Sequence, residues 1–320
     1  MTSSQVRSPA DPGGHPAPAA AGSGNPRSAD RPRRLRRYRA QVSSASSIAS
    51  PTASPTARAF LDLRGGWRQR ELWGHLAWQD IRQRYRRSVL GPIWITISMA
   101  VTAVALGVLY AGLFGNDLSV QLPYILVGFI VWGFISGCIN EGSEVFISNE
   151  GLIRQLPAPL SVHVYRLVWR QVLFFAHNLI VYVVMLLVFP QPLNWGSLLA
   201  LPAFVLLTVN GAWVALLLGI VTTRFRDLLP ITQSMVQLLF FLTPIVWIYQ
   251  DLLENAKVAA RARLVEFNPL LHFVEFIRQP MLGQPQHLRH WIVVLVITVV
   301  GWALTLFALR RYRSRVAYWV

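Results

Sequence analysis

The sequence is short of charged residues, of lysine and of cysteine, and each shortage excludes a class of protein. Only 14% of the 320 residues are charged, whereas a soluble domain carries roughly a quarter. The single lysine, Lys257, follows Ala256, so the Gly-Lys-Ser/Thr ending of a nucleotide-binding P-loop is absent. The single cysteine, Cys138, excludes a disulfide framework and a thiolate metal site. We therefore expect neither a soluble enzyme nor an ATPase, and no metal or cofactor on this chain.

Hydrophobic residues and arginine are abundant instead. Hydrophobic residues make up 53% of the chain, and 30 basic against 14 acidic residues give a formal net charge of +16. Such a charge is also typical of nucleic-acid-binding proteins, whose basic residues cover a soluble face. Here the arginines flank long apolar runs, which is the distribution of a protein in a bilayer. We expect a membrane protein that binds no nucleic acid.

The N-terminal part divides into a tail and a helix. Residues 1–57 are rich in Pro, Ala, Ser and Arg and cannot offset the entropy cost of ordering, so a disordered cytoplasmic tail is predicted. Residues 60–87 are predicted to form an amphipathic interface helix, with a cytosolic helix packed on a partner as the alternative. The apolar arc holds Trp67, Trp73, Ala77, Trp78, Ile81 and Tyr85, and the polar arc Arg68, Glu71, His75, Gln79, Arg82, Gln83 and Arg86.

Six apolar segments follow, each with roughly the 20 residues that cross a hydrocarbon core as a helix. They are 92–115, 121–140, 166–189, 197–222, 228–249 and 290–309. Basic residues gather in the segments that are cytoplasmic when the N-terminus is inside, and the first two outer loops hold none. By the positive-inside rule both termini are expected in the cytoplasm. The sequence therefore predicts an all-α protein with a six-span membrane domain over 88–320.

Prolines are expected to shape the last third of the chain. Pro244, after Thr243, is expected to kink the fifth apolar segment. The long outer stretch 250–289 is expected to form helices near 251–262 and 270–282 at the outer membrane face. A break between them is predicted at Asn268-Pro269.

Few ionisable residues lie in or beside the apolar runs. His177 would suit a proton relay, but no membrane carboxylate accompanies it, so a buried hydrogen-bonding role is favoured. Glu141 and Glu144 lie one helical turn apart at the inner end of the second segment. Acid–base chemistry is one interpretation of this pair, and the preferred one is salt bridges to Arg154, Arg166 or Arg170.

Four short motifs form a set along the chain. RYRRSVLGPIW at 84–94 joins the amphipathic helix to the first apolar segment, and NEGLIR occupies 149–154. RDL stands at 226–228, and NPL at 268–270 is followed by Arg278. As a set, together with the six-span layout, these motifs resemble the permeases of ABC-2 type cell-surface polysaccharide exporters over residues 60–320. The long tail, and Gln155 where a basic residue is expected, depart from that pattern.

The resemblance implies an assembly and three kinds of site. It implies a permease homodimer with two ATPase subunits that bind ATP and Mg²⁺, and a channel lined by the first and fifth spans. It implies a cytoplasmic coupling helix that contacts the ATPase, made of Asn149, Glu150, Gly151, Leu152, Ile153, Arg154 and Gln155. It also implies gate helices in the last outer loop, marked by Asn268, Pro269 and Arg278.

Aromatic and basic side chains supply candidates for cargo contact. Aromatic faces can carry sugars, so the candidate channel-lining residues are Trp94, Tyr110, Phe129, Trp132, Phe240 and Phe241. Guanidinium groups seek phosphate, so the candidate headgroup residues at the membrane entry are Arg82, Arg84, Tyr85, Arg86 and Arg87. Packing is the alternative role for each aromatic residue, and positive-inside anchoring is the alternative for the arginines.

The expected cargo is a polyprenyl-pyrophosphate-linked polysaccharide carried outward across the bacterial inner membrane. Lipid-linked cell-wall galactan or an O-antigen-like glycan is expected, and teichoic acid is an alternative. A proton-coupled secondary transporter would need an acid partner for His177, and a membrane glycosyltransferase would need paired metal-binding aspartates. Neither feature is present in the sequence. A scaffold role is also open, but the polar and aromatic residues within the spans favour a pathway.

Overall fold

The computed structural model describes residues 54–86, 91, 93–155, 158–254, 259 and 263–320. These ranges contain helices and no strand, which confirms an all-α chain; the tail over 1–57 lies almost wholly outside them. Five helical segments are long and apolar enough to cross a membrane. They are α4 (Ile93–Phe114), α5 (Leu118–Ser143), α7 (Ser161–Val188), η2 with α8 (Trp195–Leu199 and Ala200–Arg224), and α13 (Leu288–Trp319).

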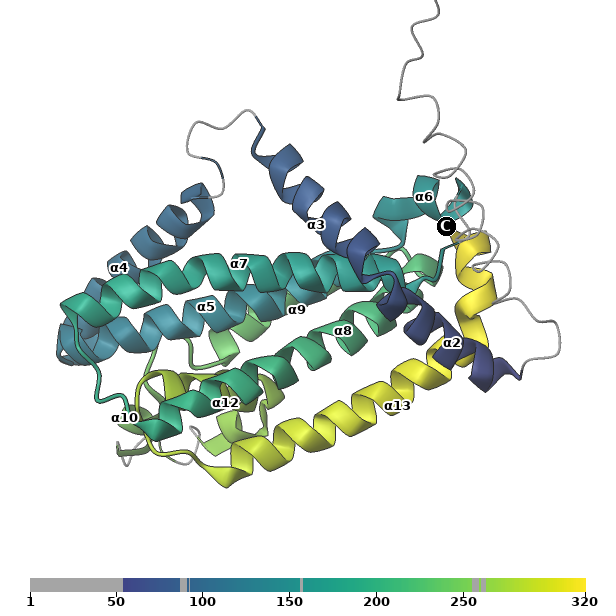
Figure 1. Cartoon of the computed structure of the whole chain (residues 1–320). Helices are drawn as coiled ribbons and strands as arrows, with labels where there is room; N and C mark the ends of the chain where they lie inside the picture. The colour runs from purple at the N-terminus through teal and green to yellow at the C-terminus, as the bar shows by residue number, and fades with distance from the viewer. Residues whose placement is uncertain (1–53, 87–90, 92, 156–157, 255–258, 260–262) are drawn as a thin grey trace, which may run out of the picture. The chain divides into compact units, whose positions relative to one another are not determined.

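Helix α5 is the centre of the described bundle. It packs against α4, α7, α8, α9 (Leu228–Leu242) and α12 (Pro269–Met281), while α13 packs along α8 (Figure 1). Every residue from Leu122 to Gly128 is buried, so this stretch of α5 faces other helices on all sides. A helix that is apolar all round belongs in such a central position.

The fifth apolar segment is not one kinked helix, and that expectation is wrong. Helix α9 ends at Leu242, and Thr243 has extended backbone angles of φ −95° and ψ 135°. Steric contact with the proline ring disfavours a helical residue before proline, so Pro244 ends the helix at this point. A second helix, α10 (Tyr249–Glu254), follows α9 after the six residues 243–248. The 15 residues of α9 span about 22 Å, which is less than a hydrocarbon core of about 30 Å.

The predicted interface helix is also interrupted, and its single-helix form is wrong. The structure has α2 (Pro55–Arg68) and α3 (Arg70–Arg84), separated at Gln69 with φ −87° and ψ 33°. Both pieces pack against α7. The polar arc is confirmed, since all seven of its residues are exposed. Of the apolar arc, Ala77 and Ile81 are buried, whereas Trp67 and Trp78 are exposed.

Asp62 attaches α2 to the rest of the protein. Its side chain is fully buried, and its carboxylate accepts hydrogen bonds from the backbone amides of Leu160 (3.2 Å) and Ser161 (3.0 Å). These amides begin α7, so a carboxylate from α2 satisfies the start of that helix. The same carboxylate accepts a 2.6 Å bond from the Nε of Arg313 near the end of α13. One residue thus joins three helices that are far apart in sequence.

Helix α12 is packed within the bundle, and its expected place at the outer membrane face stays a prediction. All residues from Leu271 to Met281 are buried, and the helix packs against α5, α8 and α13. Asn268 caps it through a 3.0 Å bond from the amide of Leu270, and Pro269 is its first residue. The predicted break at Asn268-Pro269 is confirmed. The other predicted outer helix is represented by α10 and by the 3-10 turn η3 (Arg263–Phe267), with undescribed residues between them.

Close packing of α5 on α8 depends on Gly142. A Cβ at this position would lie 2.7 Å from the Cα of Ala215, a backbone atom that cannot move aside easily. We expect Gly142→Ala to lower the unfolding free energy by about 1–3 kcal/mol, because the two helices must separate. The measurement is the thermal midpoint of the purified protein in detergent.

Gly133, on the same helix, is the matched control. A Cβ there would meet nothing within 4 Å, so Gly133→Ala should leave the midpoint unchanged or raise it. Equal loss in both variants would show that the effect does not come from the α5–α8 contact.

Candidate functional site

An ion-pair cluster joins α3, α5 and α7, and we call it the Asp80 cluster; its members are Asp80, Glu141, Arg166 and Arg170. Asp80 of α3 accepts hydrogen bonds from the Nε of Arg166 at 2.8 Å and from the Nη1 of Arg170 at 2.6 Å. Arg170 also donates to the Oε2 of Glu141 at 2.6 Å. Arg166 and Arg170 stand one helical turn apart on α7, so both reach the same face.

The cluster confirms one predicted salt bridge and adds an acid that sequence reasoning missed. Glu141 pairs with Arg170, as expected, and accepts a further bond from Gln171 at 2.8 Å. The carboxylate of Glu144 accepts a 3.3 Å bond from Gln233 and forms no salt bridge among the described residues. Asp80 went unnoticed, although its place three residues after Ala77, at the edge of the apolar arc, marked it as facing the protein.

The stretch predicted to be the coupling helix folds as a short helical segment beside this cluster. Asn149 ends the 3-10 turn η1 (Ile147–Asn149), and α6 covers Glu150–Gln155. The Nη1 of Arg166 donates to the Oδ1 of Asn149 at 3.2 Å, which links the segment to the Asp80 cluster. Arg154 pairs with Glu150 at 2.8 Å and donates to the backbone oxygen of Val320 at 2.5 Å. Figure 1 shows the end of α13 beside α6.

The outward side of α6 is available for a partner. Four of its residues are exposed, and Ile153 is half-buried against the bundle. The exposed residues are Gly151, Leu152, Arg154 and Gln155. Contact with an ATPase is a prediction that no observation here tests.

The candidate headgroup residues follow Asp80 in the sequence, at the end of α3 and just after it. Arg82, Arg84 and Arg86 are exposed, and Arg84 stands 3.6 Å from Glu141. Tyr85 is half-buried, and burial, opposed by Arg84, raises the pKa of its hydroxyl. Arg87 lies outside the described residues. These side chains stand before α4, and their contact with a headgroup stays a prediction.

Only part of the predicted channel lining comes together. Phe240 of α9 lies 5.6 Å from Phe129, 5.7 Å from Trp132 and 5.3 Å from Phe241, measured between ring centroids. This aromatic cluster joins α5 to α9, with Trp132 buried and Phe241 exposed. Tyr110 pairs with Phe114 on α4 instead.

Trp94 is exposed near the other end of α4. It makes none of the ring contacts of the aromatic cluster that joins α5 to α9. Four of the six predicted channel-lining residues therefore come together, and Trp94 and Tyr110 lie on α4 outside their cluster.

Two predicted polar residues within the bundle have different surroundings. Arg278 is fully buried on α12, where it pairs with Glu275 at 2.6 Å and lies over the ring of Tyr124 at 3.7 Å. His177 is half-buried, and its Nε2 has no hydrogen-bond partner among the described residues. Its neighbour Asn178 accepts a 3.2 Å bond from Thr96, which joins α4 to α7.

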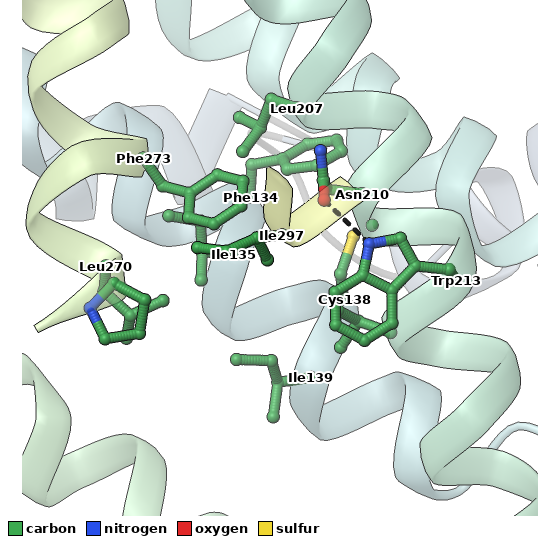
Figure 2. Close-up of a pocket in the computed structure, with 13 residues that line it drawn as sticks. Phe134, Ile135, Cys138, Ile139, Leu207, Asn210, Trp213, Leu270, Phe273 and Ile297 are labelled. Carbon is green, nitrogen blue, oxygen red and sulfur yellow. Dashed lines mark hydrogen bonds between the residues drawn. The ribbon is translucent and has the colours of Figure 1, made fainter. Parts of the chain in front are cut away.

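An apolar pocket of about 160 Å³ lies between α5, α8, α12 and α13 (Figure 2). Cys138 lies on its wall, and the indole nitrogen of Trp213 donates to the Oδ1 of Asn210 at 2.7 Å. None of the six predicted channel-lining residues belongs to this wall. The pocket is thus separate from the aromatic cluster at α5 and α9.

Glu266 joins α10, η3 and the start of α13 through a charged network. Its carboxylate accepts bonds from the Tyr249 hydroxyl at 2.6 Å and from Arg289 at 2.5 Å. The hydrogen bond from Tyr249 is the largest cause that holds the pKa of Glu266 below its usual value, and the bond from Arg289 is the next. A carboxyl group whose pKa is lower in the folded than in the unfolded protein stabilises the fold at every pH above its pKa in the unfolded protein. This stabilisation is lost as the pH falls through the pKa of the group in the folded protein.

We therefore expect Glu266→Gln to lower the thermal midpoint at pH 7, and the gap from the native protein to close below about pH 4. Both midpoints should be measured in detergent over that pH range. A gap that stays constant with pH would contradict an ionic origin.

Comparison with known proteins agrees with the motif pattern. A family model described as ABC-2 type transporter matches residues 71–282. Two proteins of Klebsiella pneumoniae named O-antigen export system permease protein RfbA are 24% and 22% identical to this chain, over 247 and 244 residues. Each alignment covers 73% of this chain and 90% of the relative. A Myxococcus xanthus protein of the same name is 21% identical over 197 residues, which is 61% of this chain and 74% of the relative.

Proposed function

The chain belongs to the ABC-2 type transporter family, and on that premise we propose that it is the membrane subunit of an ATP-driven polysaccharide exporter. The observation that carries this proposal is the similarity to O-antigen export permeases over 90% of the length of two of them. The cargo we propose is a polyprenyl-pyrophosphate-linked glycan, either cell-wall galactan or an O-antigen-like polymer. It moves from the cytoplasmic to the outer side of the inner membrane.

The proposed topology has six crossings with both termini in the cytoplasm. Segment 228–249 makes the fifth crossing through α9 and the residues that follow it. Three contacts support a common side for α2, α6 and the end of α13, namely those of Asp62 with Arg313, of α6 with α13, and of Arg154 with Val320. This end is rich in arginine, as the cytoplasmic side of a membrane protein is.

The proposed assembly is a homodimer whose pathway runs beside α9 and α4. Gln233, Ser234 and Gln237 of α9 are exposed in the single chain, and polar side chains are costly in contact with lipid tails. A second copy and a wet pathway would remove these exposed groups from contact with lipid. The aromatic cluster of Phe240 and its neighbours borders the same helix and supports a role in carrying sugars.

The proposed source of energy is a pair of ATPase subunits that bind the exposed side of α6. The Asp80 cluster then carries their movement to α3, because Arg166 contacts both Asn149 and Asp80. Arg82, Arg84 and Arg86, exposed on and after α3, would receive the pyrophosphate of the cargo before it enters the pathway.

Depletion of the protein in its native cell tests the proposal. Polyprenyl-linked glycans are then extracted and analysed chemically, and we expect one long lipid-linked polymer to accumulate on the cytoplasmic side. Its composition separates galactan, O-antigen-like glycan and teichoic acid. Unchanged surface glycans with no accumulating lipid-linked polymer would show that the cargo is not a polysaccharide.

A further inference from the structure

A hollow of about 810 Å³ lies between the last turns of α8 and α13, and no role described above involves it. Its wall is partly polar and combines arginine with aromatic side chains. The residues that matter for its chemistry are Arg224, Phe225, Tyr312, Arg315, Tyr318 and Trp319. We call it the Arg224 hollow.

The two arginines of the hollow lack a counter-charge. The Cζ of Arg224 lies 5.6 Å from the ring centroid of Phe225 and 5.4 Å from that of Trp319. Throughout the part of the chain that the structure describes, neither Arg224 nor Arg315 makes a hydrogen bond or an ion pair. Aromatic faces and the carbonyl end of α8 favour a guanidinium at this point. They position the positive groups but leave their N–H donors free for an anion.

The position of the hollow at the ends of membrane-spanning helices points to the kind of anion that would fit it. It lies at the ends of two helices that are apolar enough to span a membrane. Tyrosine and tryptophan side chains collect at the level of the lipid headgroups, and arginine reaches out to the same level. A group at that level would meet the phosphates of membrane lipids.

We propose that the Arg224 hollow binds the headgroup phosphate of an anionic membrane phospholipid. Arg224 and Arg315 donate to the unesterified phosphate oxygens, for which guanidinium forks are well suited. Tyr312, Tyr318 and Trp319 cover the less polar glycerol region. This lipid site does not depend on the proposed export function, because it needs neither the ATPase nor the glycan. A negative result for lipid binding would therefore leave the export proposal unchanged.

Native mass spectrometry of the full chain in detergent tests the site. With phosphatidylglycerol added, we expect one lipid per chain to remain bound at concentrations where phosphatidylcholine is lost. The double variant Arg224→Gln, Arg315→Gln should reduce bound phosphatidylglycerol by about tenfold. The double lysine variant should retain part of the binding, because it keeps both charges but loses the forks.

The double variant Arg226→Gln, Arg311→Gln is the matched control, because both of its arginines are exposed near the same helix ends but do not line the hollow. Equal loss of lipid in this control would overturn the proposal, since bulk charge would then explain the binding. Displacement of the lipid by an equal concentration of inorganic pyrophosphate would also overturn it, because a soluble phosphate would then be the ligand.

Discussion

Glu275→Ala is expected to lower the unfolding free energy by about 3–5 kcal/mol, because it leaves Arg278 as an uncompensated buried charge. Arg278 is 0% exposed and Glu275 is 4% exposed. The Nη1 of Arg278 donates to Glu275 at 2.6 Å and to the backbone oxygen of Pro244 at 2.9 Å. The measurement is the midpoint of heat-induced loss of the monodisperse peak in size-exclusion chromatography.

Two variants separate charge from shape at this pair. Glu275→Gln keeps an oxygen acceptor for Arg278 and should lose less stability than Glu275→Ala. The double variant Glu275→Leu, Arg278→Met removes both charges, and should be more stable than Glu275→Ala, since an apolar pair replaces a broken ionic one. If Glu275→Ala has the native midpoint, the pair does not hold α12 in the bundle.

The Glu275–Arg278 pair lies where its loss would also affect export. Arg278 contacts α12's own Glu275, the ring of Tyr124 on α5 and the chain just after α9. Gly128 makes room for it, because a Cβ there would lie 2.4 Å from the Nη2 atom of Arg278. Loss of the pair would release α12 and the end of α9 together. Under the proposed function these segments border the exit of the pathway, so export should fall with the midpoint.

The second large effect is expected at Asp80. Under the proposed function, Asp80→Asn should reduce export at least about tenfold while the protein still inserts and binds its ATPase. The carboxylate serves both Arg166 and Arg170, and a hydrogen bond to a charged group contributes about 1.5–3 kcal/mol. Without it α3 is no longer held to α7, and movement of α6 cannot reach α3 through Arg166.

Export and ATP hydrolysis should be measured together in vesicles that contain the complex. We expect Asp80→Asn to hydrolyse ATP with little transport, and Asp80→Glu to retain most transport because it keeps the charge. Gln79→Ala, an exposed change on the same helix at a residue with no proposed role, is the control for general damage to α3. Parallel loss of hydrolysis and transport in Asp80→Asn would assign the cluster to folding rather than to coupling.

Local patterns in the sequence located most helices and the exposed face of α3. Hydropathy over about 20 residues depends only on the residues within the window, so α4, α5, α7 and α8 were found with small boundary errors, whereas α13 continues past the predicted end at 309 to Trp319. The polar arc from Arg68 to Arg86 was found for the same reason, since helical periodicity alone sets which side chains share a face. The break at Asn268-Pro269 follows from the capping and ring geometry of two adjacent residues.

Only the tertiary structure decided how these helices attach to one another. Asp62 contacts Ser161 and Arg313, and Asp80 contacts Arg166, across separations of 99, 251 and 86 residues. A carboxylate in a basic, exposed-looking segment gives no local sign of its distant partner, so both acids were missed. The structure also breaks the interface helix at Gln69, and packing between distant helices buries Arg278 of α12. Sequence determined which segments are helical and apolar, whereas packing between distant helices determined which charges are buried, paired or left free.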